Sequence, residues 1–202
     1  MASVSVVAVV VLLACSALCA EDDPSCFPQP GEKRVHAGDC CDVKDSFPES
    51  MKEAHGKCKD KVGLPPPPKE HPTGPPPPEI KNKFICAAEC VFEELSLLTE
   101  DKQLNEEAIR KYFSSEDADL QAVKKAAIDK CLSTYKEQID SSLDCKSGAA
   151  QFKKCLGREV FMNCPAARYK GGEDCDGLKE KVPKCPNMPL HLGPPPPHHK
   201  PE

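Results

Sequence analysis

The sequence predicts an all-α fold whose short helices are stapled together by disulfide bonds. Two observations carry this prediction. Of the 14 cysteines in this 202-residue chain, 12 follow the first 20 residues, and such an even, dense set is typical of oxidised, crosslinked proteins. In addition, apolar residues recur at helical spacing along the chain, whereas no segment alternates apolar and polar residues as a half-buried strand does.

The first 20 residues are predicted to be a signal peptide. An apolar run at 4–18 ends in small residues, and three acidic residues follow at 21–23. The run is too short to cross a membrane comfortably, and cleavage is expected after Ala20, although no Lys or Arg precedes the run. Secretion is therefore expected, which agrees with the oxidising compartment that the cysteines indicate.

The mature chain is expected to be a single domain at 21–190 with a proline- and histidine-rich tail at 191–202. Two runs of four prolines lie in an insertion at 64–78 that cannot be helical, and a third run lies in the tail. Both segments are interpreted as solvated, because the SH3- and WW-like domains that bind polyproline are mostly intracellular. No other apolar stretch is long enough for a membrane span, and the net charge of −5 disfavours nucleic acid as a partner.

Six helices are expected from apolar residues at 3.6-residue spacing. They lie at 47–62, 80–98, 106–113, 115–135, 152–160 and 175–182. Ser46 and Glu49 form a candidate capping box before the first helix. Asn105 is the expected N-cap of the third helix because two glutamates follow it, and Ser115 is expected to open the fourth.

Cys86 and Cys90 lie on successive turns of the second predicted helix. They point about 120–160° away from the centre of the apolar stripe that Phe84, Val91 and Leu95 form. A bond between the two cysteines would constrain nothing beyond this helix, so each is expected to bond a different segment. The second helix is therefore expected to be packed on one side, crosslinked on the other, and central to the fold.

The cysteine spacing resembles the six-cysteine framework of insect odorant-binding proteins. The matching pattern is Cys58-x27-Cys86-x3-Cys90-x40-Cys131-x23-Cys155-x8-Cys164. Its x3 and x8 gaps are the most specific marks of that family. The surplus cysteines and Pro165, directly after Cys164, resemble the Plus-C subfamily, whose members carry twelve cysteines and a proline at that place. The resemblance covers nearly the whole mature chain.

The resemblance implies three interlocked disulfides. They are Cys58–Cys90, Cys86–Cys155 and Cys131–Cys164. The six other cysteines pair in an order that the sequence leaves open; they are Cys26, Cys40, Cys41, Cys145, Cys175 and Cys185. Adjacent cysteines form a strained bond, and three of these six precede the framework. At least one of those three is therefore expected to bond Cys145, Cys175 or Cys185.

The resemblance also implies a function. In members of that family, short helices enclose an apolar cavity, and the proteins carry small hydrophobic molecules, such as odorants, through aqueous lymph. A secreted, non-enzymatic carrier is therefore expected, with a small hydrophobic ligand, an olfactory receptor as a further candidate partner, and no cofactor or metal. The candidate lining residues are Phe84, Val91, Phe92, Leu95, Leu98, Ile109, Phe113, Val123, Tyr135, Phe152, Phe161 and Met162. For each of them, core packing without ligand contact is an equal alternative.

Other functions have less support in the sequence. The segment at 39–45 resembles the active helix of secreted phospholipases A2, but Lys44 stands where the general base would be a histidine. No zinc-protease, serine-hydrolase or phosphate-binding motif occurs. His55 suits acid-triggered ligand release chemically, but the sequence identifies no partner for it. Two alternatives stay open: a general hydrophobic-ligand or nutrient carrier outside olfaction, and a disulfide-rich interaction protein without a ligand.

Overall fold

The computed structural model describes residues 23–27, 35–43, 48–66, 74–188, 190 and 192. The predicted signal peptide and parts of the predicted proline-rich insertion and tail lie outside the described residues. Within the described ranges the chain forms seven α-helices and two isolated β-bridges but no strand, which confirms the all-α class. The helices are α1 (Ala37–Cys40), α2 (Glu49–Lys61), α3 (Pro78–Glu94), α4 (Glu106–Tyr112), α5 (Ala118–Thr134), α6 (Ala149–Met162) and α7 (Glu173–Lys184), with 3-10 helices η1 (Pro24–Cys26) and η3 (Tyr135–Gln138).

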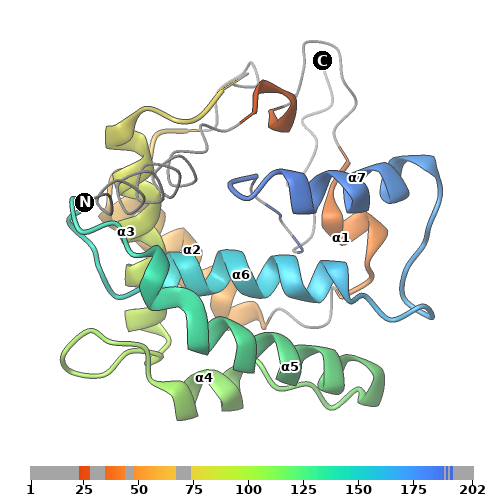
Figure 1. Cartoon of the computed structure of the whole chain (residues 1–202). Helices are drawn as coiled ribbons and strands as arrows, with labels where there is room; N and C mark the ends of the chain where they lie inside the picture. Colours follow the sequence, from red (N-terminus) through yellow and green to blue (C-terminus); the bar gives the residue numbers. More distant parts are fainter. Residues whose placement is uncertain are drawn as a thin grey trace, which may run out of the picture.

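Helix α6 lies in the middle of the molecule, between α5 and α7 (Figure 1). It packs on α3, α5, α7 and η3, while α2 packs on α3 and α1 packs on α7. Helix α3, which the sequence predicts to be central, shares that role with α6. All the residues at 87–92 of α3 are buried, so the C-terminal half of this helix is enclosed on every side rather than along one stripe.

The N-cap of α4 is Asn105, as predicted. Its side-chain oxygen accepts a hydrogen bond of 3.1 Å from the Ala108 N–H. Helix α2, in contrast, begins directly after Pro48, which takes the N-cap position instead of Ser46. The ring of a proline disfavours the helical conformation in the residue before it, so the helix cannot extend back past Pro48. Ser46 lies outside the described residues.

Helix α5 begins three residues later than the sequence predicts. Its N-cap is Asp117 rather than Ser115, because the Asp117 carboxylate accepts a 3.0 Å hydrogen bond from the Leu120 N–H. The same carboxylate forms an ion pair with Arg168, in the segment after α6. The hydrogen bond to the Leu120 N–H, with a smaller contribution from Arg168, lowers the pKa of Asp117.

Six disulfides crosslink the described helices and loops. They are Cys26–Cys185, Cys40–Cys175, Cys41–Cys164, Cys58–Cys90, Cys86–Cys145 and Cys131–Cys155. The bond Cys58–Cys90 agrees with the pairing that the family resemblance implies. Cys86 and Cys90 bond different segments, as the geometry of their helix predicts.

The other two implied pairs, Cys86–Cys155 and Cys131–Cys164, are wrong. Cys131 bonds Cys155, and Cys164 bonds Cys41. Cys155 lies within α6 and bonds α5, whereas α6 ends at Met162, so Cys164 lies beyond the helix and bonds the N-terminal arm. The interlocked order of the framework is kept when Cys145 counts as its fifth cysteine and Cys155 as its sixth. The first cysteine then bonds the third, the second bonds the fifth, and the fourth bonds the sixth.

The three remaining disulfides tie the N-terminal arm to the C-terminal segment. They are nested, with the innermost cysteines of the two segments bonded to each other and the outermost likewise. The expected crosslink between the arm and the C-terminal half is therefore confirmed. The two segments also pair through their backbones, since the Lys170 N–H donates to the Cys40 carbonyl at 2.9 Å and the Asp42 N–H donates to the Arg168 carbonyl at 3.0 Å.

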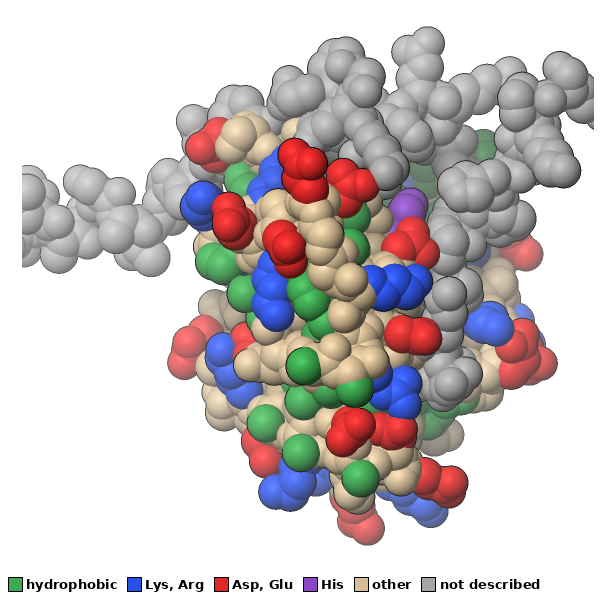
Figure 2. Space-filling view, turned by 90° about the vertical axis from the view of Figure 1, so that its right-hand side faces the viewer, with side chains coloured by type: hydrophobic (Ala, Val, Ile, Leu, Met, Phe, Trp, Pro, Cys, Tyr) green, Lys and Arg blue, Asp and Glu red, His purple; other side chains and the backbone are tan. Residues whose placement is uncertain are grey.

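The surface carries mixed charge. Figure 2 shows acidic and basic side chains interspersed over one face, with hydrophobic side chains in small groups between them. Opposite charges also pair along one helix, as Lys125 and Asp129 do at 3.8 Å on α5. Across the ranges that the structure describes, no helix combines the length and the apolar character needed to cross a membrane.

Candidate ligand-binding site

Three buried phenylalanine rings from three helices meet in the core. Phe92 lies on α3, Phe113 is the C-cap of α4, and Phe152 lies on α6. The ring centroids are 6.3 Å apart for Phe92–Phe113, 6.1 Å for Phe92–Phe152 and 5.8 Å for Phe113–Phe152. These separations are those of favourable aromatic pairs, so the three rings form one continuous cluster, called here the aromatic centre.

A tight connection folds α4 back toward α3 and brings Phe113 to the aromatic centre. Leu98 and Leu104 form an antiparallel β-bridge that closes this connection. Ser96 and Lys102 both adopt a φ of 56°, which lets the chain reverse within a few residues. Asn105 then caps α4, and Phe113 follows at the end of that helix.

A buried carboxylate fixes two loops beside α3. Glu89, which is 7 % exposed, accepts a 2.9 Å hydrogen bond from the Ser147 N–H in the segment before α6. Lys102, in the α3–α4 connection, forms ion pairs with Glu93 at 2.9 Å and with Glu89 at 3.7 Å. The hydrogen bond to Glu93 raises the pKa of Lys102. Both loops are thereby tied to the helix that carries Phe92.

Helix α2 contributes apolar side chains and one hydroxyl to this region. Met51 and Ala54 are buried on its inner face. The Tyr112 ring packs edge-on against Phe113 with centroids 5.1 Å apart, and its hydroxyl lies 3.0 Å from the Ser50 Oγ. Tyr112 therefore joins α4 to α2 with its polar end while its ring extends the apolar surroundings of Phe113.

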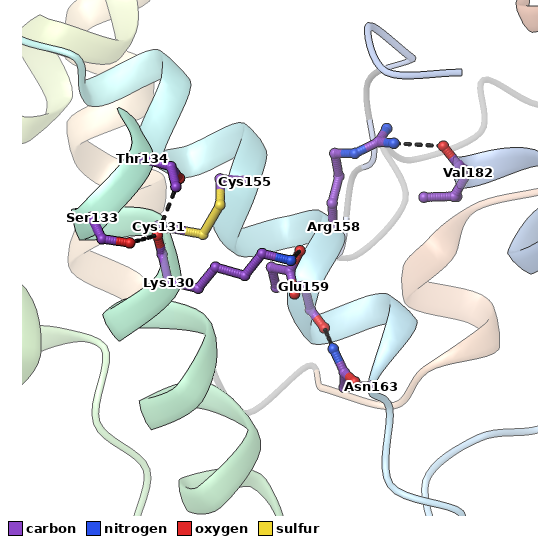
Figure 3. A network of polar contacts seen from close by, with 9 residues as sticks. All are labelled: Lys130, Cys131, Ser133, Thr134, Cys155, Arg158, Glu159, Asn163 and Val182. Atoms are coloured by element: carbon purple, nitrogen blue, oxygen red, sulfur yellow. Dashed lines mark hydrogen bonds and ion pairs between the residues drawn. A yellow bond between two sulfur atoms is a disulfide. The ribbon is translucent and has the colours of Figure 1, made fainter. Parts of the chain in front are cut away.

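The seam between α5 and α6 is held by covalent and polar contacts (Figure 3). Beside the Cys131–Cys155 bond, the Lys130 Nζ lies 2.6 Å from a Glu159 carboxylate oxygen. A surface hollow of about 460 Å³ opens along this seam. Its lining residues are Ala122, Val123, Ala126, Ala127, Lys130, Glu159 and Asn163. Its lining therefore combines small apolar side chains of α5 with polar side chains of both helices.

The structure places the twelve predicted lining residues in different environments. Seven are buried in the core: Val91, Phe92, Ile109, Phe113, Tyr135, Phe152 and Phe161. Leu95, Leu98 and Met162 are half-buried against the core, and Val123 is half-buried at the α5–α6 hollow. Phe84 is 54 % exposed, so the expectation that it lines the interior is wrong. It lies on α3 before the buried turns at 87–92 begin, so it falls outside the part of the helix that the core encloses.

Sequence reasoning missed some apolar residues of the same core. Leu97 and Leu104 are 1 % and 5 % exposed, but they lie in the α3–α4 connection, where no helical period marks them. Met51 and Ala54 lie in the predicted helix at 47–62 but are not among the candidate lining residues. The core cluster includes all four.

His55, for which the sequence identifies no partner, has one in the structure. Its Nε2 on α2 lies 2.8 Å from the Nζ of Lys153 on α6. Burial lowers the pKa of Lys153 to about 8 from the ordinary 10.5. The contact between α2 and α6 therefore holds an amine that loses its proton more readily than an ordinary lysine does.

Known proteins share this sequence pattern. General odorant-binding protein 68 of Anopheles gambiae is 27% identical over 179 residues, which cover 83% of this chain and 78% of that protein. Odorant-binding protein 47 of the same organism is 27% identical over 118 residues, which cover 50% of this chain and 51% of that protein. The PBP/GOBP family matches residues 41–159, a range that is more than half of the chain and contains the whole aromatic centre. The chain therefore belongs to the PBP/GOBP family of insect odorant-binding proteins.

Proposed function

We propose that this protein is a secreted, non-enzymatic carrier that binds small hydrophobic molecules at the aromatic centre. The observation that carries the proposal is the meeting of Phe92, Phe113 and Phe152 inside a frame of crosslinked helices. Burying apolar ligand surface contributes about 25 cal/mol per Å², so a small ligand held by such rings reaches micromolar affinity without a covalent bond. The names of the two relatives support odorants and similar semiochemicals as the ligand class.

Binding at the aromatic centre requires the three rings to part, because they touch one another in the structure. The helices that carry two of them are covalently held: Cys58–Cys90 ties α3 to α2, and Cys131–Cys155 ties α6 to α5. Side chains can therefore move while the frame keeps its place, which limits the ordering cost of binding.

The proposal extends to the protein's subfamily and setting. The twelve cysteines after the leader, with Pro165 directly after Cys164, favour the Plus-C subfamily. Residues 1–20 are proposed as a signal peptide and 21–190 as the carrier domain, acting in extracellular lymph with an olfactory receptor as a candidate partner. The six disulfides support an oxidising, extracellular location.

A fluorescent apolar probe tests the proposal. Oxidised protein that begins at Glu21 is titrated with N-phenyl-1-naphthylamine and then with volatile alcohols, ketones and esters. One probe should bind per chain, and the volatiles should displace it. Phe113→Leu should weaken probe binding because it removes one ring of the aromatic centre, whereas Phe84→Leu, at an exposed ring on α3, should not.

Two results would contradict the proposal. One is the absence of probe binding by protein whose disulfides are confirmed, which would favour an interaction protein without a ligand. The other is equal affinity of the Phe113→Leu variant and the unmodified chain, which would move the site away from the aromatic centre. A general carrier outside olfaction would bind the same probe, and the tissue in which the transcript occurs separates that alternative.

A further inference from the structure

The amine of Lys153 lies where three segments of the chain meet. Its Nζ is 2.8 Å from the His55 Nε2, which joins α6 to α2. The C-terminal segment runs along the same helix, since the Lys154 Nζ donates to the Asn187 side chain at 2.8 Å. A Cβ at Gly157, one turn beyond Lys153, would lie 3.5 Å from the Leu190 carbonyl oxygen. Residues one turn apart share a helix face, so the C-terminal segment also covers the side of α6 that carries Lys153.

The buried core begins one turn away from this pair on both helices. Met51, one turn before His55 on α2, and Leu156, three residues beyond Lys153 on α6, are both buried. Residues one turn apart share a helix face, so the amine lies next to the apolar core.

The contact with His55 limits how many protons the pair can hold. An ammonium and an imidazolium are both donors only, so a hydrogen bond between Lys153 and His55 requires a lone pair on one of the two nitrogens. Burial, which lowers the pKa of Lys153 to about 8, favours loss of the lysine proton. With that pKa, about one amine in ten is neutral near pH 7, against fewer than about one in a thousand for an ordinary lysine.

We propose that Lys153 captures small aldehydes as a reversible imine. This inference rests on the proposed function, because the aldehyde must first enter the apolar core. Desolvated lysine amines are the nucleophiles that form Schiff bases with carbonyl compounds. The carrier would then hold one chemical class, saturated and unsaturated alkyl aldehydes, more firmly than alcohols or esters of equal length.

The reaction is balanced without an oxidant or a further reactant. The lone pair of the neutral amine attacks the carbonyl carbon, and one N–H proton passes to the carbonyl oxygen to give a carbinolamine. The hydroxyl group then leaves as water with the second proton, and a C=N bond replaces the C=O bond. The His55 Nε2, 2.8 Å from the amine, is placed to accept the proton that the lysine ammonium must lose first.

A buried lysine on another helix supplies an internal comparison. Lys124 on α5 is 6 % exposed, and burial lowers its pKa as well. Asp117 opposes that shift, because the attraction of its negative charge favours the protonated form of Lys124. Lys124 is therefore expected to react less than Lys153, although both amines are shielded from water.

Reductive trapping tests the inference. The oxidised protein is incubated near neutral pH with nonanal and cyanoborohydride, which converts an imine into a stable alkylamine, and the modified lysine is located by peptide mass spectrometry. Lys153 should be alkylated at least about ten-fold faster than the exposed Lys125, given its larger neutral share. Lys153→Arg should abolish that label, since a guanidinium does not form the imine, while Lys125→Arg should leave it unchanged.

The outcomes separate this inference from the proposed function. Labelling spread evenly over the exposed lysines, or concentrated at Lys124, would overturn the role of Lys153. If nonanal and 1-nonanol both displace the fluorescent probe but no label forms at Lys153, the carrier function stands and the imine is rejected. If the probe does not bind the unmodified protein, the proposed function fails first. A melting temperature of Lys153→Arg near that of the parent would show that its lost label is not a folding defect.

Discussion

Phe152 shows how much of the core depends on one side chain. It is fully buried and contacts both other rings of the aromatic centre, Phe92 and Phe113. The chain has only seven phenylalanines and no tryptophan, so few large side chains fill its interior. Loss of this ring removes apolar contacts that no neighbouring residue can restore.

Phe152→Ala should lower the free energy of unfolding by about 3–5 kcal/mol, because it leaves a cavity between α3, α4 and α6. Phe84→Ala is the matched control, since the Phe84 ring is 54 % exposed and its removal should change stability by less than about 0.5 kcal/mol. Denaturant unfolding of the oxidised proteins measures both. Equal losses for the two variants would contradict the packing of the aromatic centre.

The lowered pKa of Lys153 predicts that the free energy of unfolding rises with pH in the alkaline range. Its pKa is about 8 in the folded chain and near 10.5 when unfolded, so between these values the unfolded chain binds more protons. The free energy of unfolding should therefore rise with pH from about 8 to 10.5, relative to the Lys153→Met variant. Chemical unfolding of both proteins at several pH values measures the difference. A constant difference across that range would show that Lys153 is not desolvated.

Helix termini illustrate what local sequence can and cannot specify. Asn105 was predicted to cap α4 from the two glutamates after it, and its side chain does bond the Ala108 N–H. Ser115 was an equally good local candidate for α5, yet Asp117 is the N-cap. Asp117 also pairs with Arg168, 51 residues away in sequence, which a local pattern cannot contain.

The Asn105 cap should contribute measurably to stability. Asn105→Ala should cost about 1 kcal/mol of unfolding free energy, because the Ala108 N–H loses its acceptor at the start of a seven-residue helix. Asn105→Ser should retain most of the stability, since serine is also a good N-cap. Thermal unfolding compares the three proteins. A Ser variant as unstable as the Ala variant would assign the effect to something other than capping.

Arg158 joins α6 to the end of α7. Its guanidinium donates to the Val182 carbonyl (Figure 3) and, at 2.9 Å, to the Cys185 carbonyl, in addition to the hydrogen bonds that these oxygens accept from backbone N–H groups. The C-terminal segment that covers Lys153 follows directly after these residues. Arg158 is thus a link between α7 and the contact region of α2 and α6.

Arg158→Met should loosen that link without unfolding the protein. Amide hydrogen exchange at 182–188 should become about ten-fold faster, because hydrogen bonds from charged groups contribute about 1.5–3 kcal/mol. Arg110→Met, which removes surface ion pairs to Asp129 and Glu106, should leave exchange at 182–188 unchanged. Unaltered exchange in the Arg158 variant would contradict this role.

At the scale of the whole molecule, disulfides act in two groups. Cys58–Cys90 and Cys131–Cys155 join two helices each, and Cys86–Cys145 joins α3 to the segment before α6; the three bonds span 24 to 59 residues of sequence. The three nested bonds between the termini close loops of 123 to 159 residues. Because these bonds are nested, one of them closes a long loop, and each further bond then restricts only the short segments between neighbouring cysteines.

A disulfide map would decide the pairing directly. Proteolysis of the oxidised protein without reduction should release a crosslinked peptide pair that contains Cys86 and Cys145, and another that contains Cys131 and Cys155. Mass spectrometry before and after reduction identifies both. Recovery of Cys86 bonded to Cys155 would restore the pairing implied by the resemblance and refute the one in the structure.

The sequence by itself determined the helical class, the approximate positions of six helices and, through its resemblance to a family, the bond Cys58–Cys90. These features depend on helical periodicity and on cysteine spacing, both of which can be read along the chain. The phenylalanines at 92, 113 and 152 were all among the candidate lining residues, although their meeting at one point was not predictable.

Only the tertiary structure decided which cysteine bonds Cys86, that Phe84 is exposed, and that His55 meets Lys153. Each of these depends on which segments become neighbours: Cys86 and Cys145 are 59 residues apart in sequence, and His55 and Lys153 are 98 apart. A helical period states which residues share a face, but not which other element covers that face. In this chain, the packing of α6 against α3, α5 and α7 determines which helix faces are covered.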